Sequence, residues 1–442
     1  MMNSKKKILL QCQSLTYLYT GLASILTKYS IDEVNIDIFF TKNECPQEFL
    51  NYIKMNEVFQ NLYLINSSIY DKINKKLFSR KINFFNKIYF NYLLKKDIAT
   101  RLKKQLDNND YSEVFYSEGG CSFIYLTIAY PNAHFVMYGD GSGLIYNPSN
   151  SKLIDFNQNT SEKRLYKLKS PDEIIALAPY KKDDSVDITG VPISATNPHT
   201  LLDIIKQDKE IQHKVDDFAN SISSDFSQYD KKILLLPSRL EDKRFCMQDD
   251  DQINIYVDII NKYTTNNSLV ILKPHPTSKI NLLSSLREKC SCKIIDIPDD
   301  LKPLPVETYV NLLNQMDKII TFLSSSKVSL KAIFNIDALD EYDVIQNYPL
   351  KERVNIDLKV FSEVCKRFDN WDKKSIVYEC DVLPEYKKFY QKYSKPFFVP
   401  RKNTFIENIF SIRNIGTPDE KRKQLTILGV KFKFKSGKKY IE

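Results

Sequence analysis

Short apolar runs alternate with longer amphipathic stretches along the first half of the chain. The apolar runs are typical of buried strands, and stretches whose apolar residues recur every three to four positions are typical of helices. The predicted strands are Lys7–Cys12, Val34–Phe40, Leu62–Ile65, Glu113–Tyr116 and His134–Tyr138. The predicted helices are Leu15–Tyr29, Glu48–Phe59 and Asp97–Leu106. This alternation predicts a mostly parallel, doubly wound sheet.

A second series of the same kind follows a polar helical segment at Leu201–Ile222. Its predicted strands are Lys232–Leu236, Leu269–Lys273, Lys293–Ile295 and Lys318–Phe322. Its predicted helices are Gln252–Tyr263, Ile280–Lys289, Val306–Met316 and Lys327–Phe334. These strand–helix units predict a second Rossmann-like domain, in which ligands bind outside the carboxyl ends of the strands.

The predicted fold class is therefore α/β, with two Rossmann-like domains facing a central cleft. We place the first domain at residues 1–225 and the second at residues 226–385. Residues 386–442 form a third segment of helical and aromatic character, followed by a basic tail. The candidate helices of this region are Pro384–Tyr393 and Thr404–Arg413.

Composition narrows the classes of protein that fit. Of the 442 residues, 43% are hydrophobic and 27% charged, a balance that indicates a globular protein rather than a disordered one. The net charge of +9 is a mild excess that favours anionic partners such as nucleotides, acidic glycans or lipid headgroups. It does not indicate nucleic-acid binding. Glycine occurs only 10 times, which argues against a glycine-rich nucleotide loop.

The cysteines and the N-terminus bear on metal binding and location. No Cys-x-x-Cys pair occurs, and Cys290 and Cys292 lack two further ligands at zinc-binding spacing, so we predict no metal site. Free thiols suit a reducing cytoplasm. The apolar run after Lys5-Lys6-Lys7 is interrupted by Gln11 and Gln13, and no stretch reaches the roughly 18 apolar residues of a spanning helix. These features predict a cytoplasmic protein.

The last residues are strongly basic. Residues 421–442 hold eight basic side chains against one acid, Glu442, and the segment Val430–Lys435 alternates apolar and basic positions. One interpretation is a solvated tail. The other is peripheral contact with anionic lipid at the inner face of the cell membrane, to which each basic residue contributes roughly 1 kcal/mol.

Candidate chemistry begins with His275 in the segment Leu272–Pro276. Two prolines flank this histidine directly after a predicted strand and fix the local backbone. A rigid histidine at a strand's carboxyl end is suited to act as a general acid or to bind a phosphate. The structural alternative is a capping or buried histidine.

Three further segments follow predicted strands or open predicted helices. Asp140, between Gly139 and Gly141, is a candidate general base, and the alternative is a solvated Asp-Gly turn. Ser324 and Ser325 precede a helix, where hydroxyls and free N–H groups bind anions, and the alternative is a serine N-cap. Glu307, after Pro305, could accept hydrogen bonds from a ribose. The alternative is an acid in the first turn of a helix that the helix dipole stabilises.

In this order, Asp140-Gly141, His275-Pro276 and Ser324-Ser325 resemble the motifs of bacterial sialyltransferases, namely the lipooligosaccharide sialyltransferases and the alpha-2,8-polysialyltransferases. The resemblance covers roughly residues 110–335. It implies a GT-B fold and an inverting, metal-independent transfer of sialic acid from a CMP-activated donor, without a cofactor. It further implies that Asp140 is the base, that His275 contacts the leaving phosphate and that the serine pair binds this phosphate.

One position departs from the family pattern. The family carries two acidic residues before the glycine, and here Gly139 occupies the first of these positions. If the base belongs there, Glu118, which follows another predicted strand, is the reserve candidate. The loop after the strand Lys232–Leu236 makes Ser238 and Arg239 candidate donor-binding residues, together with Lys273 and Pro276. Residues 11–14 could line the acceptor side.

Two alternatives remain at this point. The donor could be another CMP-activated 2-keto sugar acid, such as Kdo, legionaminic or pseudaminic acid, since these share the phosphate and the carboxylate. The basic tail also fits a different class, a non-catalytic protein that binds membranes or glycans.

Overall fold

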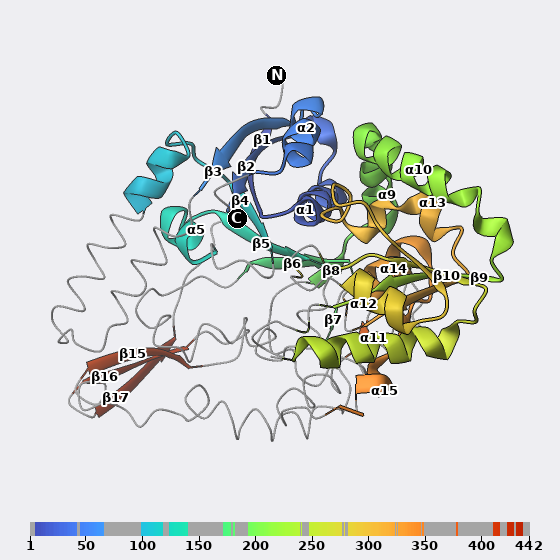
Figure 1. The fold of residues 1–442 in the computed structure, drawn as a ribbon. Helices are drawn as coiled ribbons and strands as arrows, with labels where there is room; N and C mark the ends of the chain where they lie inside the picture. The colour runs from blue at the N-terminus through green and yellow to red at the C-terminus, as the bar shows by residue number, and fades with distance from the viewer. Residues whose placement is uncertain are drawn as a thin grey trace. The chain divides into compact units, whose positions relative to one another are not determined.

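The computed structural model shows two large parallel sheets flanked by helices (Figure 1). The chain's contacts divide it into two compact units, Met1–Phe389 and Tyr390–Glu442. The described residues are 5–41, 45–65, 99–117, 123–139, 171–177, 180–181, 193–238, 240, 247–275, 278, 282–322, 324, 326–345, 347–348, 377–378, 410–415, 422–427 and 430–435.

The first sheet has seven strands in the order β3-β2-β1-β4-β5-β6-β8, and every neighbouring pair is parallel. The order reverses between β1 and β4. From this point the chain adds β2 and β3 toward one edge of the sheet and β5, β6 and β8 toward the other. The strands are β1 Lys6–Cys12, β2 Val34–Phe40, β3 Phe59–Leu64, β4 Glu113–Ser117, β5 His134–Gly139, β6 Glu173–Ala176 and β8 Ile193–Ala195.

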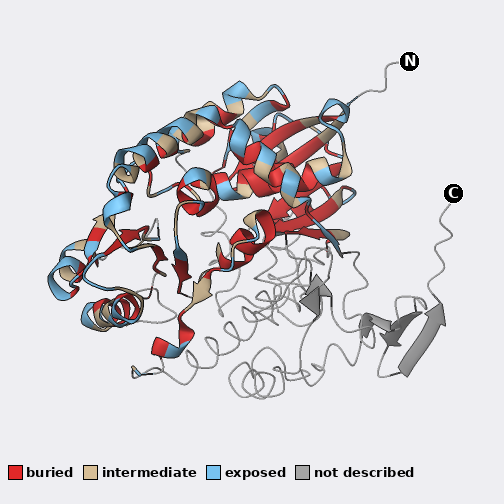
Figure 2. Ribbon diagram, turned by 90° about the vertical axis from the view of Figure 1, so that its right-hand side faces the viewer, coloured by how far each residue is buried: buried red, intermediate tan, exposed pale blue. Residues whose placement is uncertain are grey.

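Both faces of this sheet are covered, which explains why its strands are continuous apolar runs. Leu10 belongs to a core cluster that includes residues of the helix α1 (Leu15–Lys28), and Leu9 belongs to a second cluster with Leu126 of α5 (Phe123–Ala129). Figure 2 shows the strands buried between helices whose outer sides are exposed. A further helix, α2, spans Gln47–Met55.

The second sheet has five parallel strands in the order β11-β10-β9-β12-β13, with its reversal between β9 and β12. The strands are β9 Lys231–Leu236, β10 Ser268–Leu272, β11 Lys293–Asp296, β12 Lys318–Thr321 and β13 Leu339–Asp340. The helical elements are α11 Asp249–Tyr263, α12 Leu282–Lys289, η3 Val306–Thr308, α13 Val310–Leu313, α14 Ser326–Phe334 and α15 Tyr342–Ile345. The predicted α/β fold with two Rossmann-like domains is thus confirmed.

Two helices, α9 (Pro198–Gln207) and α10 (Lys209–Ser223), lie between the sheets in sequence. Asp208 separates them, caps α10 by accepting from the Ile211 N–H, and accepts a 2.7 Å hydrogen bond from the Tyr19 hydroxyl on α1. On the other side, the Gln212 amide donates to the Thr308 carbonyl at 3.1 Å. The connecting helices are therefore bonded to elements of both sheets.

Several predicted boundaries are wrong, each for a local reason. The helix predicted for Glu48–Phe59 ends at Met55, because Phe59 pairs with Ile36 in the sheet. The single helix predicted for Val306–Met316 is a 3₁₀ turn followed by the short α13, with a non-helical Tyr309 between them. The continuous segment Leu201–Ile222 is broken at Asp208.

The C-terminal unit contains an antiparallel sheet of β15 (Phe410–Ile415), β16 (Arg422–Ile427) and β17 (Val430–Lys435). The helix predicted for Thr404–Arg413 is therefore wrong over its last four residues, which lie in β15. A two-stranded parallel pair joins β7 (Tyr180–Lys181) to β14 (Val377–Tyr378) in the first unit. The proposed domain boundaries at 225 and 385 stay predictions.

Candidate functional site

The candidate site lies at the carboxyl edge of the five-stranded sheet, where the strand order reverses. Ligands of open α/β sheets bind at such reversals because the loops on the two sides diverge there. Ser238 follows β9, Lys273 and His275 follow β10, and Ser324 follows β12. Since β10, β9 and β12 are neighbours, the structure places all four predicted residues along one stretch of this edge.

Ser238 links the two loops on either side of the strand reversal. Its hydroxyl donates a short hydrogen bond to the carbonyl of Phe322, directly after β12. The hydroxyl of Tyr256 on α11 donates to the Ser238 carbonyl at 2.9 Å. These bonds join the loops after β9 and β12, so Ser238 shapes the site through the main chain.

Ser324 binds the first residue of the helix α14. Its Oγ accepts from the Ser326 N–H at 3.2 Å and lies 3.0 Å from the Ser326 hydroxyl, while its carbonyl accepts from the Lys327 N–H at 3.2 Å. The N-cap position itself is residue 325, which lies outside the described residues, so the serine N-cap considered from the sequence stays a prediction. The helix α14 has nine residues and begins at the carboxyl edge of the sheet, so its positive end is positioned to stabilise an anion.

Glu307 reaches the first turn of α14 from the 3₁₀ turn η3. It is buried, and its Oε1 accepts a short hydrogen bond from the hydroxyl of Ser329. The structure thus brings Glu307 and the serine turn together, although 17 residues separate Glu307 from Ser324 (324 − 307). Sequence reasoning missed Ser329. A hydroxyl among the apolar residues of α14 was the signal for it.

Lys273 is a buried cation beside this carboxylate. It is only 6% exposed, and its Nζ donates to the Lys302 carbonyl at 3.2 Å and lies 5.6 Å from the centre of the Tyr309 ring. Burial lowers its pKa to about 8, and the negative charge of Glu307 opposes that shift. A positive charge in a poorly hydrated position acts strongly on a nearby anion.

His275 is exposed, so the buried-histidine alternative is wrong. Its carbonyl accepts from the Ser278 N–H at 2.9 Å, which forms a turn directly after the strand β10. The histidine is therefore at the surface of the carboxyl edge. This position suits a group that must meet a substrate from solution.

Six predicted site residues lie outside the described residues, and their roles stay predictions. They are Glu118, Asp140, Gly141, Arg239, Pro276 and Ser325. Glu118 comes directly after β4 and Asp140 directly after β5, so both candidate bases follow the carboxyl edge of the seven-stranded sheet. The convergence of Asp140 with His275 also stays a prediction.

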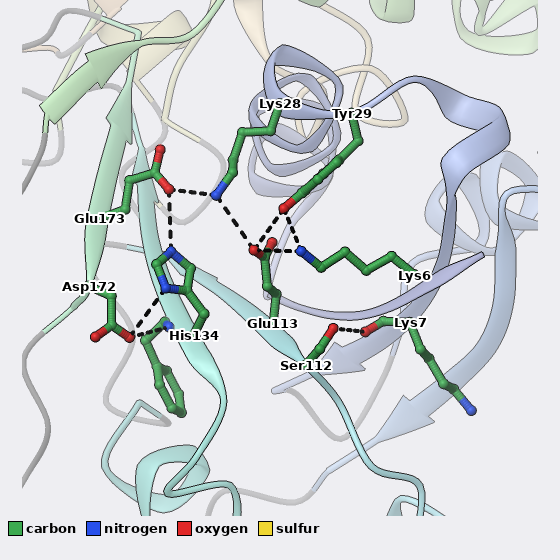
Figure 3. A network of polar contacts seen from close by, with 10 residues as sticks. Lys6, Lys7, Lys28, Tyr29, Ser112, Glu113, His134, Asp172 and Glu173 are labelled. Atoms are coloured by element: carbon green, nitrogen blue, oxygen red, sulfur yellow. Dashed lines mark hydrogen bonds and ion pairs between the residues drawn. The ribbon is translucent and has the colours of Figure 1, made fainter. Parts of the chain in front are cut away.

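A polar network marks the opposite, amino edge of the first sheet (Figure 3). Glu113 at the start of β4 accepts from Lys6 at 3.0 Å and from Tyr29 at 2.7 Å. Glu173 at the start of β6 binds Lys28 at 2.5 Å and His134 at 3.4 Å. Because ligands of such sheets bind at the carboxyl edge, we interpret this network as a brace between strand starts and α1.

The described residues also bear on metal binding and on membrane insertion. In this part of the chain, no cluster of three or more His, Cys, Asp or Glu side chains is arranged to hold a metal ion. The thiols of Cys290 and Cys292 are free and buried, and burial raises the pKa of Cys290 to about 11. No described helix is both long and apolar enough to cross a bilayer.

Two parallel sheets of this kind in tandem, each with a strand reversal, are the fold of GT-B type glycosyltransferases. The family model described as alpha-2,8-polysialyltransferase matches residues 22–340. The chain therefore belongs to the alpha-2,8-polysialyltransferase family, as its motifs predict, and it is a sialyltransferase-type glycosyltransferase. Membership implies a nucleotide-sugar donor and a glycan acceptor.

Solved structures show more distant similarity. A UDP-GlcNAc 2-epimerase from Neisseria meningitidis is 12% identical with a TM-score of 0.45, over 81% of this chain and 99% of that one. The corresponding epimerase from Methanocaldococcus jannaschii is 15% identical, with a TM-score of 0.43 over 88% and 99%. A ugt transferase from Siraitia grosvenorii is 8% identical, with a TM-score of 0.37 over 88% and 99%. No curated protein sequence matches the chain.

Proposed function

We propose that the protein transfers sialic acid, or a related nonulosonic acid, from a CMP-activated donor to a cell-surface glycan of the capsule or lipooligosaccharide type, with inversion and without a metal ion. The observation that supports this most directly is the cluster at the carboxyl edge of the second sheet. There the first turn of α14 is bonded to Glu307, which lies within electrostatic range of the buried Lys273. A helix end and a cation suit one phosphate, and a carboxylate suits a ribose.

In this proposal the acceptor hydroxyl attacks the anomeric carbon of the donor while the bond to the CMP oxygen breaks. Asp140, or Glu118 in its place, accepts the hydroxyl proton. His275 donates a proton or a hydrogen bond to the departing phosphate. Displacement from the opposite face inverts the anomeric centre.

The remaining groups hold the donor. Ser324, Ser325 and the N–H groups of α14 would bind the CMP phosphate, and Lys273 would stabilise the charge that develops on it. Glu307 would accept from the ribose hydroxyls. Arg239, Pro276 and Gly141 adjoin these groups in sequence and complete the proposed set.

His275→Ala tests the role in leaving-group departure. We expect release of CMP from CMP-sialic acid to fall at least about 100-fold, because general acid catalysis contributes roughly 10²–10⁴-fold. His213→Ala is the matched control, since His213 is an exposed histidine on the connecting helix α10. Unchanged turnover in the His275 variant, at the same thermal stability as the control, would exclude the proposed role.

The identity of the donor requires a panel at fixed acceptor. CMP-linked sialic, legionaminic and pseudaminic acids and Kdo share the phosphate and carboxylate, so we expect activity within this group. A preference for UDP- or GDP-sugars would defeat the proposal. For the non-catalytic alternative, the discriminating result is a thermal midpoint that CMP does not raise, because a ligand bound only by the folded state must stabilise it.

We also propose peripheral contact with an anionic membrane through the C-terminal sheet. Paired strand residues share a face, so the register places five basic residues and no acidic residue on one side of this sheet. They are Arg413, Arg422, Lys431, Lys433 and Lys435. The opposite face carries mostly apolar positions, including Ile412, Leu425 and Phe432. The alternation of apolar and basic residues in the sequence thus gives the sheet one basic face and one mostly apolar face.

Charge reversal at Lys431, Lys433 and Lys435 tests this contact. We expect sedimentation with phosphatidylserine vesicles to fall at least about tenfold relative to the unchanged protein, since each basic residue contributes roughly 1 kcal/mol. Reversal at the exposed Lys104, Lys206 and Lys209 is the control with equal net charge. Equal loss in both triple variants would indicate a non-specific charge effect and contradict the proposed face.

A further inference from the structure

Ser329 places a hydroxyl on the side of α14 that meets the 3₁₀ turn η3. Its neighbours in sequence, Val328 and Leu330, are apolar and buried, and Ser329 itself is 7% exposed. Its hydroxyl donates a short hydrogen bond to Oε1 of Glu307 and lies 3.1 Å from the Ser326 carbonyl. A hydroxyl has one hydrogen, so it donates fully to only one of these acceptors. The carboxylate is the nearer acceptor and carries the charge, so the hydrogen goes to Glu307.

The main chain of η3 is held by other bonds. The N–H and the hydroxyl of Thr308 reach the Pro305 carbonyl at 3.1 Å and 2.7 Å. The Gln212 amide of α10 donates to the Thr308 carbonyl at 3.1 Å. These bonds fix the backbone beside Glu307 but not the torsions of its long side chain, whose ordering costs entropy. The bond from Ser329 fixes the carboxylate itself.

The surroundings of Glu307 limit what it can bind. The N-terminus of α14 suits a phosphate, and a carboxylate beside it repels that phosphate. A nucleotide must therefore present hydrogen-bond donors to Glu307, and the ribose joined directly to the phosphate carries hydroxyls. The buried ammonium of Lys273 lies within electrostatic range and favours the ionised carboxylate, which only accepts.

We infer that Ser329 is a positioning residue that selects ribonucleotides, because it holds the Glu307 carboxylate in the orientation that accepts from the ribose 2′-hydroxyl. This inference rests on the proposed function, in which Glu307 binds the ribose of the donor. Ser329 acts through Glu307 and does not touch the nucleotide. A nucleotide that lacks the 2′-hydroxyl leaves the oriented carboxylate without that donor and is rejected.

The test compares Ser329→Ala with Ser24→Ala in the full-length protein. Ser24 is a fully buried serine of α1 whose hydroxyl donates to the Thr20 carbonyl at 2.8 Å, so it controls for loss of a buried helical hydroxyl. Calorimetric titrations with CMP and with 2′-deoxy-CMP give the ratio of the two Kd values. We expect the unchanged protein and Ser24→Ala to bind CMP at least about tenfold more tightly, the effect of one hydrogen bond to a charged group. In Ser329→Ala the two Kd values should lie within about threefold of each other.

Two further variants separate positioning from packing. Ser329→Thr keeps the hydroxyl, so we expect it to keep the preference for CMP. Glu307→Gln should lower the preference by itself, since a neutral amide accepts more weakly than a carboxylate. Added to Glu307→Gln, Ser329→Ala should have no further effect on the ratio, because the two residues act as one unit.

The outcomes distinguish this inference from the proposed reaction. An unchanged ratio in Ser329→Ala, an equal loss in Ser329→Thr, additive effects with Glu307→Gln, or no preference for CMP in the unchanged protein would each overturn the inference. If CMP-sialic acid is turned over without any dependence of the ratio on Ser329, the proposed function stands alone. If the ratio depends on Ser329 but no CMP-sugar is turned over, the proposed reaction fails while the nucleotide site stands. Absence of CMP binding would overturn both.

Discussion

Lys273 carries a buried charge that lowers the stability of the folded protein. Its pKa is 10.5 when unperturbed and about 8 in the folded protein, because burial disfavours the ammonium form. Near pH 7 the side chain is charged in both the folded and the unfolded states. The buried charge therefore costs roughly 3 kcal/mol of folding free energy.

Replacement by an apolar side chain of similar length should remove this cost in folding free energy. We expect Lys273→Met to raise the free energy of unfolding at pH 7 by about 1–3 kcal/mol and to weaken CMP binding at least about tenfold. A denaturation series and a CMP titration measure the two effects. Lower stability together with unchanged CMP affinity would contradict both the cost of the buried charge and its role.

The pH dependence gives an independent check on Lys273. A base with a lowered folded-state pKa loses its proton more readily in the folded state, so its cost disappears as pH rises from about 8 to 10.5. We expect the unchanged protein to gain stability relative to Lys273→Met across that window. A parallel pair of stability curves would be inconsistent with a strongly lowered pKa.

At the scale of secondary-structure elements, Asp208 joins three helices: it lies between α9 and α10 and bonds to α1. Burial raises its pKa, while hydrogen bonds from Tyr19 and from the Ile211 N–H lower it in part. An acid with a raised folded-state pKa holds its proton longer when folded, so its ionisation removes stability as pH rises from about 3.9 through the folded value. The carboxylate nevertheless caps α10 and ties it to α1.

Two substitutions separate the charge of Asp208 from its hydrogen bonds. Asp208→Asn keeps one oxygen that can cap α10, and its amide nitrogen can donate to the Tyr19 hydroxyl in place of the bond that Oδ2 accepts. We therefore expect higher stability than the unchanged protein at pH 7 and a smaller difference at pH 4. Asp208→Ala removes the cap and leaves the Tyr19 hydroxyl unpaired, at a cost of about 1–3 kcal/mol. Thermal midpoints at the two pH values measure both. Equal losses in the two variants would show that the charge is required.

At the scale of the whole molecule, the sequence predicted both sheets because their strands are buried on two faces and so appear as unbroken apolar runs. The region around Thr404–Arg413 misled the prediction, since its scattered apolar residues suit either a helix or a strand. Only pairing with another strand decides between the two structures, and here Phe410 pairs with Ile427 of β16. Pairing with distant strands is not visible in a local pattern.

The positions of site residues that directly follow a strand could be predicted from the sequence. Contacts between segments that are distant in the sequence could not. Ser238, Lys273, His275 and Ser324 could be assigned to one edge because parallel strands end together. The bond between Ser329 and Glu307 could not be predicted, since it depends on how η3 packs on α14.

The division into two compact units leads to a prediction about the minimal enzyme. Both parallel sheets and the family match lie before residue 346, and the last strand paired within the first unit, β14, ends at Tyr378. A chain ending at Phe389 keeps all of these, so we expect CMP to raise its thermal midpoint as much as that of the full chain. The same chain lacks the basic face and should no longer sediment with phosphatidylserine vesicles. Loss of the CMP effect, in a fragment that still unfolds cooperatively, would place part of the donor site in residues 390–442 and contradict the site described above.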